Sequence, residues 1–105
     1  MNSNRKGKNG ERELASVLRE YGFDARRGVQ YHGGSESPDV IGIDGVHIEC
    51  KRCEQFRIYD WIRQSIRDAG TDVPTVMFRK NNEEWLVTMR LSDFVEVYLG
   101  QKKQN

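Results

Sequence analysis

Two carboxylates and a lysine lie close together in an otherwise apolar stretch near the middle of the chain. Asp39 follows Pro38, and Glu49 and Lys51 stand two positions apart in the run VHIECKR. Two carboxylates suit a hard cation such as Mg²⁺, which keeps several waters for a substrate and a nucleophile. A cation of this kind lowers the pKa of a bound water, and a neighbouring lysine can position that water for attack. Held together, the three side chains could hydrolyse a phosphodiester.

The two charged residues of the E-x-K triplet are expected on one face of a strand. Side chains alternate along a strand, so His47, Glu49 and Lys51 point one way, and the apolar residues at 46, 48 and 50 point the other. A triplet of this kind also occurs by chance. The chemistry therefore depends on whether the fold brings Asp39 to the same face.

Asp39 reaches that face only if the hairpin before Glu49 is irregular. A two-residue turn at residues 44–45 would pair Asp39 directly with Cys50. Paired residues share a face, so Asp39 would then point away from Glu49. A three-residue turn, a bulge or a bend just after Pro38 would each break this register. We predict one of these breaks, because a regular hairpin would rule out the site.

Hydrophobic periodicity and turn residues predict three helices and five strands around these positions. Apolar residues at helical spacing mark the helices, and short apolar or alternating runs between turn formers mark the strands. The helices are expected at residues 10–21, 58–69 and 92–99, and the strands at residues 22–30, 40–43, 46–52, 74–79 and 84–88. Asn9 and Ser92 are expected to cap helices, and Gly100 to end the last one. The order αβββαββα predicts an α/β fold with a mixed central sheet flanked by helices.

Length and composition fit one small globular domain. We expect a single domain over residues 1–105, with flexible tails at residues 1–8 and 100–105. The net charge of +1 neither favours nor excludes a nucleic-acid partner. The sequence has no apolar run of membrane-spanning length and no signal-peptide pattern. We therefore expect no membrane partner and a cytoplasmic location, in the host cytoplasm if the chain is viral.

Two motifs resemble those of known nucleases. Pro38-Asp39 followed by Glu49-Cys50-Lys51 resembles the PD-(D/E)xK signature, and RKGKNGEREL at residues 5–14 resembles the N-terminal motif of archaeal-type Holliday junction resolvases. Those proteins have the same order of elements and nearly this length, so the resemblance covers most of the chain. Two motifs in the right order are more specific than either alone. The resemblance implies a restriction-endonuclease-like domain that cuts DNA with Mg²⁺, or with Mn²⁺ in its place.

The resemblance also assigns roles to the residues of the hairpin. It implies that Asp39 and Glu49 are metal ligands, and that the main-chain carbonyl of Cys50 joins them. It implies that Lys51 is the catalytic lysine, which would orient the attacking water. A serine near the active site of many relatives corresponds to either Ser35 or Ser37, and the sequence does not decide between them.

The N-terminal motif adds an acid and an arginine. The resemblance implies that Glu11 is a further catalytic acid near the metal, which it would reach through water, and that Arg12 contacts the DNA backbone. On a helical wheel Glu11 flanks the apolar stripe and can lean towards the sheet, whereas Arg12 points almost directly away. Other basic residues beside a nuclease site would grip phosphates and make binding depend on salt. The full set expected to contact DNA is Arg5, Lys6, Lys8, Arg12, Arg26, Arg27 and Arg52.

The implied function is resolution of four-way DNA junctions by paired symmetric nicks, through attack of metal-activated water on phosphodiesters. One chain carries one such site, whereas resolution needs two cuts, so we expect a homodimer with two-fold symmetry. Three alternatives stay open. The same chemistry could act on a nicking, flap or restriction-like substrate, or the chain could bind junctions without cutting them. The chain could also be a small protein-interaction domain, which would not bind DNA at moderate salt.

Overall fold

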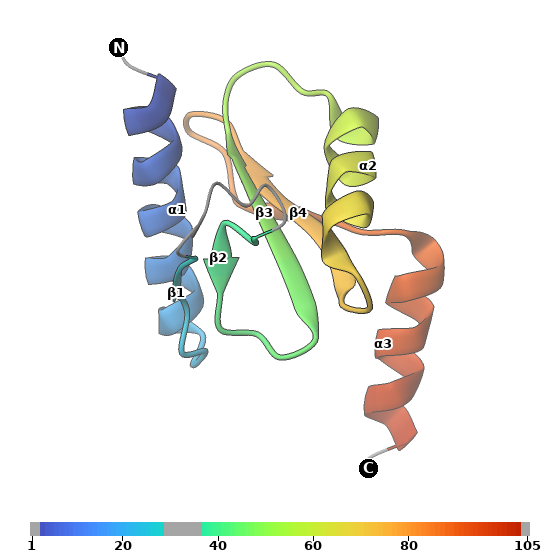
Figure 1. Cartoon of the computed structure of the whole chain (residues 1–105). Helices are drawn as coiled ribbons and strands as arrows, with labels where there is room; N and C mark the ends of the chain where they lie inside the picture. The colour runs from blue at the N-terminus through green and yellow to red at the C-terminus, as the bar shows by residue number, and fades with distance from the viewer. Residues whose placement is uncertain (1–2, 29–36, 104–105) are drawn as a thin grey trace.

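The structure is a computed structural model that describes the backbone of residues 3–28 and 37–103 and the side chains of residues 7–28 and 37–100. Within these ranges it contains three helices and one five-stranded sheet (Figure 1). The element order αβββαββα and the α/β class are those predicted from the sequence. The helices are α1 (Ser3–Glu20), α2 (Ile58–Ala69) and α3 (Leu91–Lys103), and the strands are β1 (Arg26–Arg27), β2 (Val40–Ile41), β3 (Val46–Arg52), β4 (Val73–Arg79) and β5 (Leu86–Thr88).

The strands lie in the sheet in the same order as in the chain, from β1 to β5. β3 and β4 are parallel over their whole length, from Val46 opposite Val73 to Arg52 opposite Arg79. A parallel pair needs a long crossover connection, and α2 supplies it. The other neighbouring strands pair antiparallel, so the sheet is mixed, as predicted.

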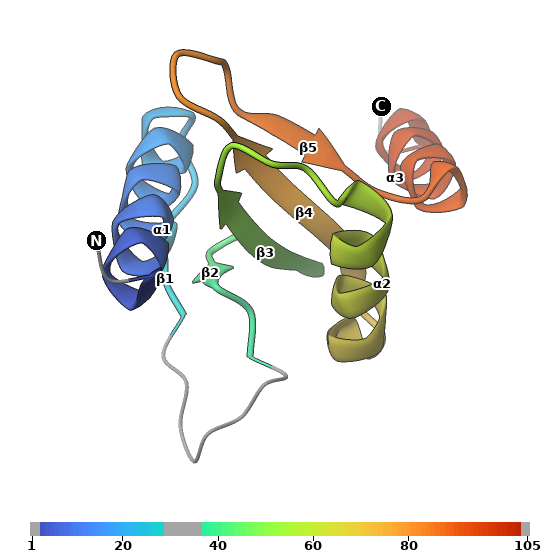
Figure 2. The same cartoon turned by 90° about the horizontal axis from the view of Figure 1, so that it is seen from above.

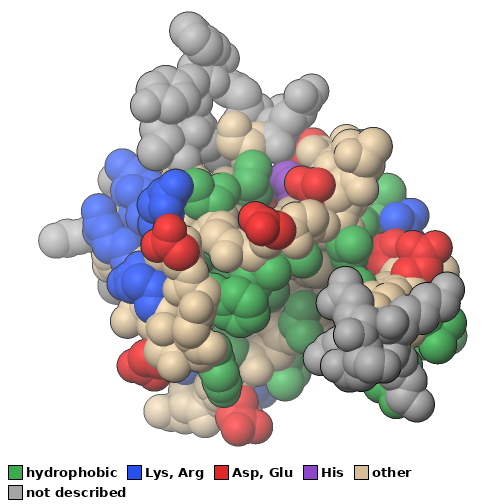
Figure 3. Space-filling view, turned by 90° about the horizontal axis from the view of Figure 1, so that it is seen from below, with side chains coloured by type: hydrophobic (Ala, Val, Ile, Leu, Met, Phe, Trp, Pro, Cys, Tyr) green, Lys and Arg blue, Asp and Glu red, His purple; other side chains and the backbone are tan. Residues whose placement is uncertain are grey.

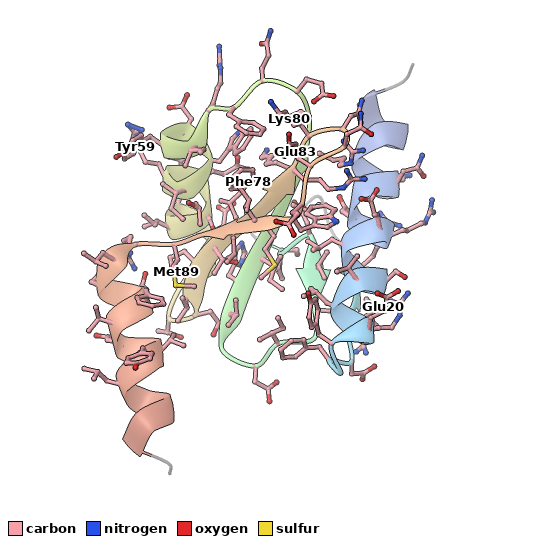
Figure 4. The ribbon with its side chains drawn as sticks, turned by 180° about the vertical axis from the view of Figure 1, so that it is seen from behind. Glu20, Tyr59, Phe78, Lys80, Glu83 and Met89 are labelled. Atoms are coloured by element: carbon pink, nitrogen blue, oxygen red, sulfur yellow. The ribbon has the colours of Figure 1, made fainter. Side chains whose placement is uncertain are left out.

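α1 and α2 cover opposite faces of the sheet (Figure 2). On one face, Leu14 of α1 belongs to a buried cluster with Val40 and Ile48. On the other face, Trp61 of α2 packs against Phe78 of β4, with ring centroids 5.6 Å apart. Phe78 lies between the sheet and α2 (Figure 4). Alternate residues of β3 therefore face α1 and α2, and this strand carries the predicted E-x-K triplet.

α1 begins earlier than predicted. It starts at Ser3, so residues 3–8, expected in a polar tail, are helical and Asn9 lies inside the helix rather than at its cap. Adding a turn to an existing helix costs little, because each added residue gains a hydrogen bond. Polar residues without an apolar stripe can therefore extend a helix whose later turns pack against the sheet. Gly10 is buried where α1 crosses the end of β3, since a Cβ on Gly10 would lie 2.8 Å from the Cβ of Arg52.

α3 extends further than predicted, to Lys103, so Gly100 does not end it. A glycine inside a helix costs about 1 kcal/mol relative to alanine, which is too little to stop a helix by itself. α3 lies beyond the end of β5 at the edge of the sheet (Figure 2). In the part of the chain that is described, no helix combines the length and the apolar character needed to cross a membrane.

Candidate active site

The hairpin of β2 and β3 has the register break that the proposed chemistry requires. Val40 pairs with Ile48, one position away from the register that a two-residue turn would give. Val40 and Ile48 both lie in the cluster against α1. Asp39 lies at a bend just before β2, and its carboxyl group makes a hydrogen bond with Glu49, whose side chain points to the opposite face. The predicted break of register is therefore confirmed.

The turn between the two strands explains this register. The N–H of Val46 donates a 3.2 Å hydrogen bond to the carbonyl of Ile43, which closes a tight turn after β2. Gly42 precedes it with a φ of 126°, a conformation that residues with a Cβ rarely adopt. These extra residues shift β2 by one position against β3.

The backbone of three neighbouring segments holds Asp39 in place. The N–H of Cys50 donates a 2.8 Å hydrogen bond to Oδ2 of Asp39. The N–H of Asp39 donates to the carbonyl of Ile48, and the N–H of Gly28 donates to the carbonyl of Asp39, each at 2.9 Å. A Cβ on Gly28 would collide with the carbonyl oxygen of Pro38. Only glycine at position 28 allows this close approach, so the position of Asp39 depends on it.

Glu49 is a buried acid next to a second one. The residue is 4% exposed, and its Oε1 lies 2.8 Å from Nε2 of His47. Burial raises the pKa of Glu49 to about 8, and the charge of Asp39 and a hydrogen bond with it add to the effect. The ammonium group of Lys51 acts in the opposite direction. A buried carboxyl group in this setting fits a bound cation, which would stabilise its ionised form.

Among the described residues, one group of three metal-binding side chains lies close together, and it differs from the predicted one. It consists of His47, Glu49 and Asp68, whose ligand atoms all lie within 4.8 Å of one another. Asp68 belongs to α2, and the other two residues to β3. Glu11 and Asp39 do not join this group, so the structure does not gather all the predicted acids around one point.

Glu11 lies on the side of the sheet that α1 covers. Its Oε1 accepts a 3.0 Å hydrogen bond from Nε of Arg27, which faces α1 because it pairs with Val40. Burial raises the pKa of Glu11 and the bond to Arg27 opposes this, while the charge of Asp39 raises the pKa further. Glu11 therefore leans towards the sheet, as predicted, and is near enough to Asp39 for their charges to interact. Arg12 is exposed, as the helical wheel predicted.

Lys51 shares the face of Glu49 and lies opposite Phe78 in the parallel ladder. It stands at the end of the sheet where β3 leads into α2. Ser37 is partly buried just before Asp39, and Ser35 lies outside the described residues, so the choice between them stays open.

The basic residues expected to contact DNA fall into two groups where their side chains are described. The exposed ones are Lys8, Arg12 and Arg26. Arg27 and Arg52 are partly buried in ion pairs, Arg27 with Glu11 at 3.0 Å and Arg52 with Glu13 at 3.6 Å. The side chains of Arg5 and Lys6 lie outside the described residues. Figure 3 shows most of the Lys and Arg side chains of one face gathered at its left, with acidic side chains beside them and across the face.

Three residues of the site were given no role from the sequence. His47 had a signal, because strand alternation places it beside Glu49, but it lacks the spacing of a familiar metal motif. Gly28 had only the general signal that glycine permits close backbone contacts. Asp68 had none, since its place depends on how α2 packs across β3.

Comparison with known proteins identifies this arrangement as a nuclease fold. A solved structure of Hjc, a Holliday junction resolvase from the archaeal hyperthermophile Archaeoglobus fulgidus, matches with a TM-score of 0.60 and 24% identity, over 80% of this chain and 72% of that one. The family model for the archaeal Holliday junction resolvases (hjc) matches residues 2–92. The chain belongs to this family and is a junction-resolving nuclease. No curated protein matches its sequence.

Proposed function

We propose that Asp39, Glu49 and Lys51 form the catalytic centre of this nuclease and that Glu11 completes it. The observation that carries the proposal is the shifted register of β2 against β3, which supports placing Asp39 beside Glu49 on the face that Lys51 shares. The burial of Glu49 and its nearness to a second acid favour a cation at this place.

The metal that we propose is Mg²⁺, with Mn²⁺ able to replace it. The residues that would hold it are Asp39, Glu49 and the main-chain carbonyl of Cys50, with Glu11 contributing through a water. When bound, the ion would lower the pKa of a water and neutralise charge on the phosphate. The donor set of carboxylate and carbonyl oxygens is the one that Mg²⁺ prefers.

The residues of the chain would prepare this centre before the substrate binds. The N–H of Cys50 engages Oδ2 of Asp39, which leaves the other carboxylate oxygen for a ligand. Arg27 orients the carboxylate of Glu11 through its 3.0 Å contact. Lys51 would hold the attacking water in line with the leaving oxygen and stabilise the negative charge that develops on the phosphate.

The basic residues around α1 would grip the DNA backbone. Lys8, Arg12 and Arg26 are exposed and can reach phosphates, whereas Arg27 and Arg52 would act from their ion pairs. Arg5 and Lys6 extend the set by their sequence positions in the N-terminal motif. Contacts of this kind position a protein on DNA without reading its sequence, which suits an enzyme that recognises a branched shape.

Two chains would associate through α3 and β5, because resolution needs two cuts and one chain supplies one proposed centre. These two elements carry a large set of exposed apolar side chains, and exposed apolar surface of this extent marks an interaction site. The set is Leu86, Val87, Leu91, Phe94, Val95, Val97, Tyr98 and Leu99. We place the enzyme in the cytoplasm, in that of the host if the chain is viral.

The test is cleavage of a labelled four-way junction with Mg²⁺, beside a linear duplex and an Asp39→Asn variant. We expect paired symmetric nicks in the junction alone, lost in the variant. Cutting of both substrates would replace junction specificity with a broader nuclease activity. Binding without any cut in Mg²⁺ or Mn²⁺ would mean that these acids are not a working catalytic centre.

A further inference from the structure

We propose that His47, Glu49 and Asp68 bind a second divalent cation, of the transition-metal type that accepts an imidazole ligand. One nitrogen of His47 and one carboxylate oxygen from each acid lie within 4.8 Å of one another. Ligand atoms this close can converge on one ion, because nitrogen and oxygen ligands lie about 2.0–2.2 Å from a metal such as Zn²⁺. The inference rests on the proposed function only through Glu49, which both ions would share.

Apart from Glu49, the donors of the second ion are different from those of the first. Asp39 does not belong to the group of three, and Cys50 of β3 holds one of its oxygens. His47 approaches Oε1 of Glu49 at 2.8 Å, and Asp68 comes from α2. Glu49 therefore stands between two sets of donors. In two-metal sites that cleave phosphodiesters the ions lie about 3.5–4 Å apart, a separation that one carboxylate can bridge.

A buried chain of hydrogen bonds fixes α2 against β3 beside these residues. Ser65, one turn before Asp68 on α2, donates a 2.9 Å hydrogen bond to the carbonyl of Thr75 on β4. The hydroxyl of Thr75 in turn donates to the carbonyl of His47 at 2.9 Å. Ser65 and Thr75 are fully buried. The site is thus built on a helix and a strand that are tied together, which holds ligands more firmly than loops do.

The chemistry of the ligands decides which cation fits. His47 is 3% exposed, and burial lowers the pKa of its imidazole, which favours the neutral form that binds metals. An imidazole with two carboxylates suits Mn²⁺ or Zn²⁺, whereas Mg²⁺ prefers oxygen ligands alone. We therefore expect the second site to discriminate against Mg²⁺, in contrast to the site of Asp39.

The number of ions bound per chain is measured by titrating the metal-free protein with Mn²⁺. The electron paramagnetic resonance signal of free Mn²⁺ reports how much of the ion is not bound. We expect two ions per chain in the wild type, of which Mg²⁺ displaces one readily. The Asp68→Asn variant should lose the ion that resists Mg²⁺, with affinity at least about tenfold weaker. The matched control is Asp72→Asn, which removes an exposed charge that acts on His47 without removing a ligand, and should keep both ions.

The Asp39→Asn variant separates this inference from the proposed function. It should lose the ion that Mg²⁺ displaces and keep the other. A single Mn²⁺ that Asp39→Asn removes and Asp68→Asn leaves unchanged would overturn the second site and support the first. Retention of both ions in Asp39→Asn would contradict the proposed function instead.

A spectroscopic measurement on the wild type tests for the imidazole ligand directly. Electron spin-echo modulation of the Mn²⁺-loaded wild type should contain the coupling of an imidazole ¹⁴N nucleus. The chain has two histidines, so the signal should survive in His32→Gln and disappear in His47→Gln. Absence of nitrogen coupling in the saturated wild type, or its loss in His32→Gln, would overturn the proposal.

Discussion

The main-chain N–H of Cys50 donates a 2.8 Å hydrogen bond to the carboxylate of Asp39, so the strand that carries the E-x-K triplet also fixes the acid of the strand before it. The donor is a backbone group, so its place depends on the path of β3 and not on a side chain. The acceptor depends on the path of the segment before β2, which Gly28 controls from the other side. The geometry of the centre is therefore set largely by the backbone.

A methyl group at position 28 should therefore impair catalysis, although the change replaces none of the proposed catalytic residues. In Gly28→Ala the new Cβ would collide with the carbonyl of Pro38, so Pro38 and Asp39 must move. Displacement of a catalytic group by about 1 Å can cost about 100-fold in rate. We expect single-turnover cleavage of a four-way junction to slow by at least about tenfold, with DNA affinity retained.

The control for this change is Gly7→Ala, which adds the same methyl group to α1 where no atom lies within 4 Å. Alanine is the better helix former, so this variant should gain up to about 1 kcal/mol in stability and cleave at the wild-type rate. If Gly28→Ala also cleaves at the wild-type rate, the position of Asp39 does not depend on the close approach of residue 28.

The contribution of Glu49 to the stability of the metal-free protein should fall as the pH rises. Glu49 keeps its proton in the folded state up to a pKa of about 8, whereas its ordinary value is 4.5. Between these values the unfolded chain has released the proton and the folded chain has not, so raising the pH favours unfolding. The stabilisation from the protonated carboxyl is complete below pH 4.5 and is lost as the pH rises through about 8. Urea unfolding curves recorded at intervals of about one pH unit between pH 5 and pH 9 would measure this loss of stability.

Glu49→Gln isolates this contribution, because the amide does not titrate. Between pH 5 and pH 8 the variant should lose the part of the slope of stability against pH that Glu49 causes. Glu11, whose pKa is also raised, should still contribute to that slope. The carboxylate is ionised at high pH, so added Mg²⁺ or Mn²⁺ should stabilise the wild type most strongly there. An identical slope in wild type and variant would show that Glu49 titrates normally.

Strand alternation made much of the hairpin predictable. It predicts that His47, Glu49 and Lys51 share one face of the strand, and that Asp39 can join them only through a broken register. The chemistry of the site requires such a break, but its kind and position could not be predicted, because a bulge, a longer turn and a bend leave similar sequence signals. The turn at Gly42 and its φ of 126° decide between them.

Residues that depend on packing between distant segments could not be predicted in this way. Asp68 reads as an ordinary helix acid, and only the packing of α2 on β3 and β4 brings it to His47. The beginning of α1 was also missed, because the residues before Gly10 carry no apolar period. Local patterns determine which face a side chain occupies, and tertiary packing determines which side chains meet.

Arg12 should contribute to DNA binding in a way that depends on salt and not on sequence. It is exposed on α1, with a contact of 3.4 Å to Asn9 of the same helix. Loss of one phosphate contact reduces the slope of log affinity against log salt by about 1. We expect Arg12→Ala to show this on junctions and duplexes alike. Arg63→Ala, which removes an exposed cation from α2, is the control that should leave the slope unchanged.

The apolar side of α3 should hold two chains together. Leu91 and Phe94 lie one turn apart on α3 and are 76% and 52% exposed. A charged side chain placed between two such surfaces would be buried without a partner in an apolar interface. We expect the wild type to sediment as a dimer and Phe94→Glu to dissociate at concentrations at least about tenfold higher. Glu96→Ala, an exposed change on the same helix, should remain dimeric. In the Phe94→Glu monomer, junction cleavage should give single nicks in place of paired ones. A monomeric wild type that still makes paired nicks would exclude this interface.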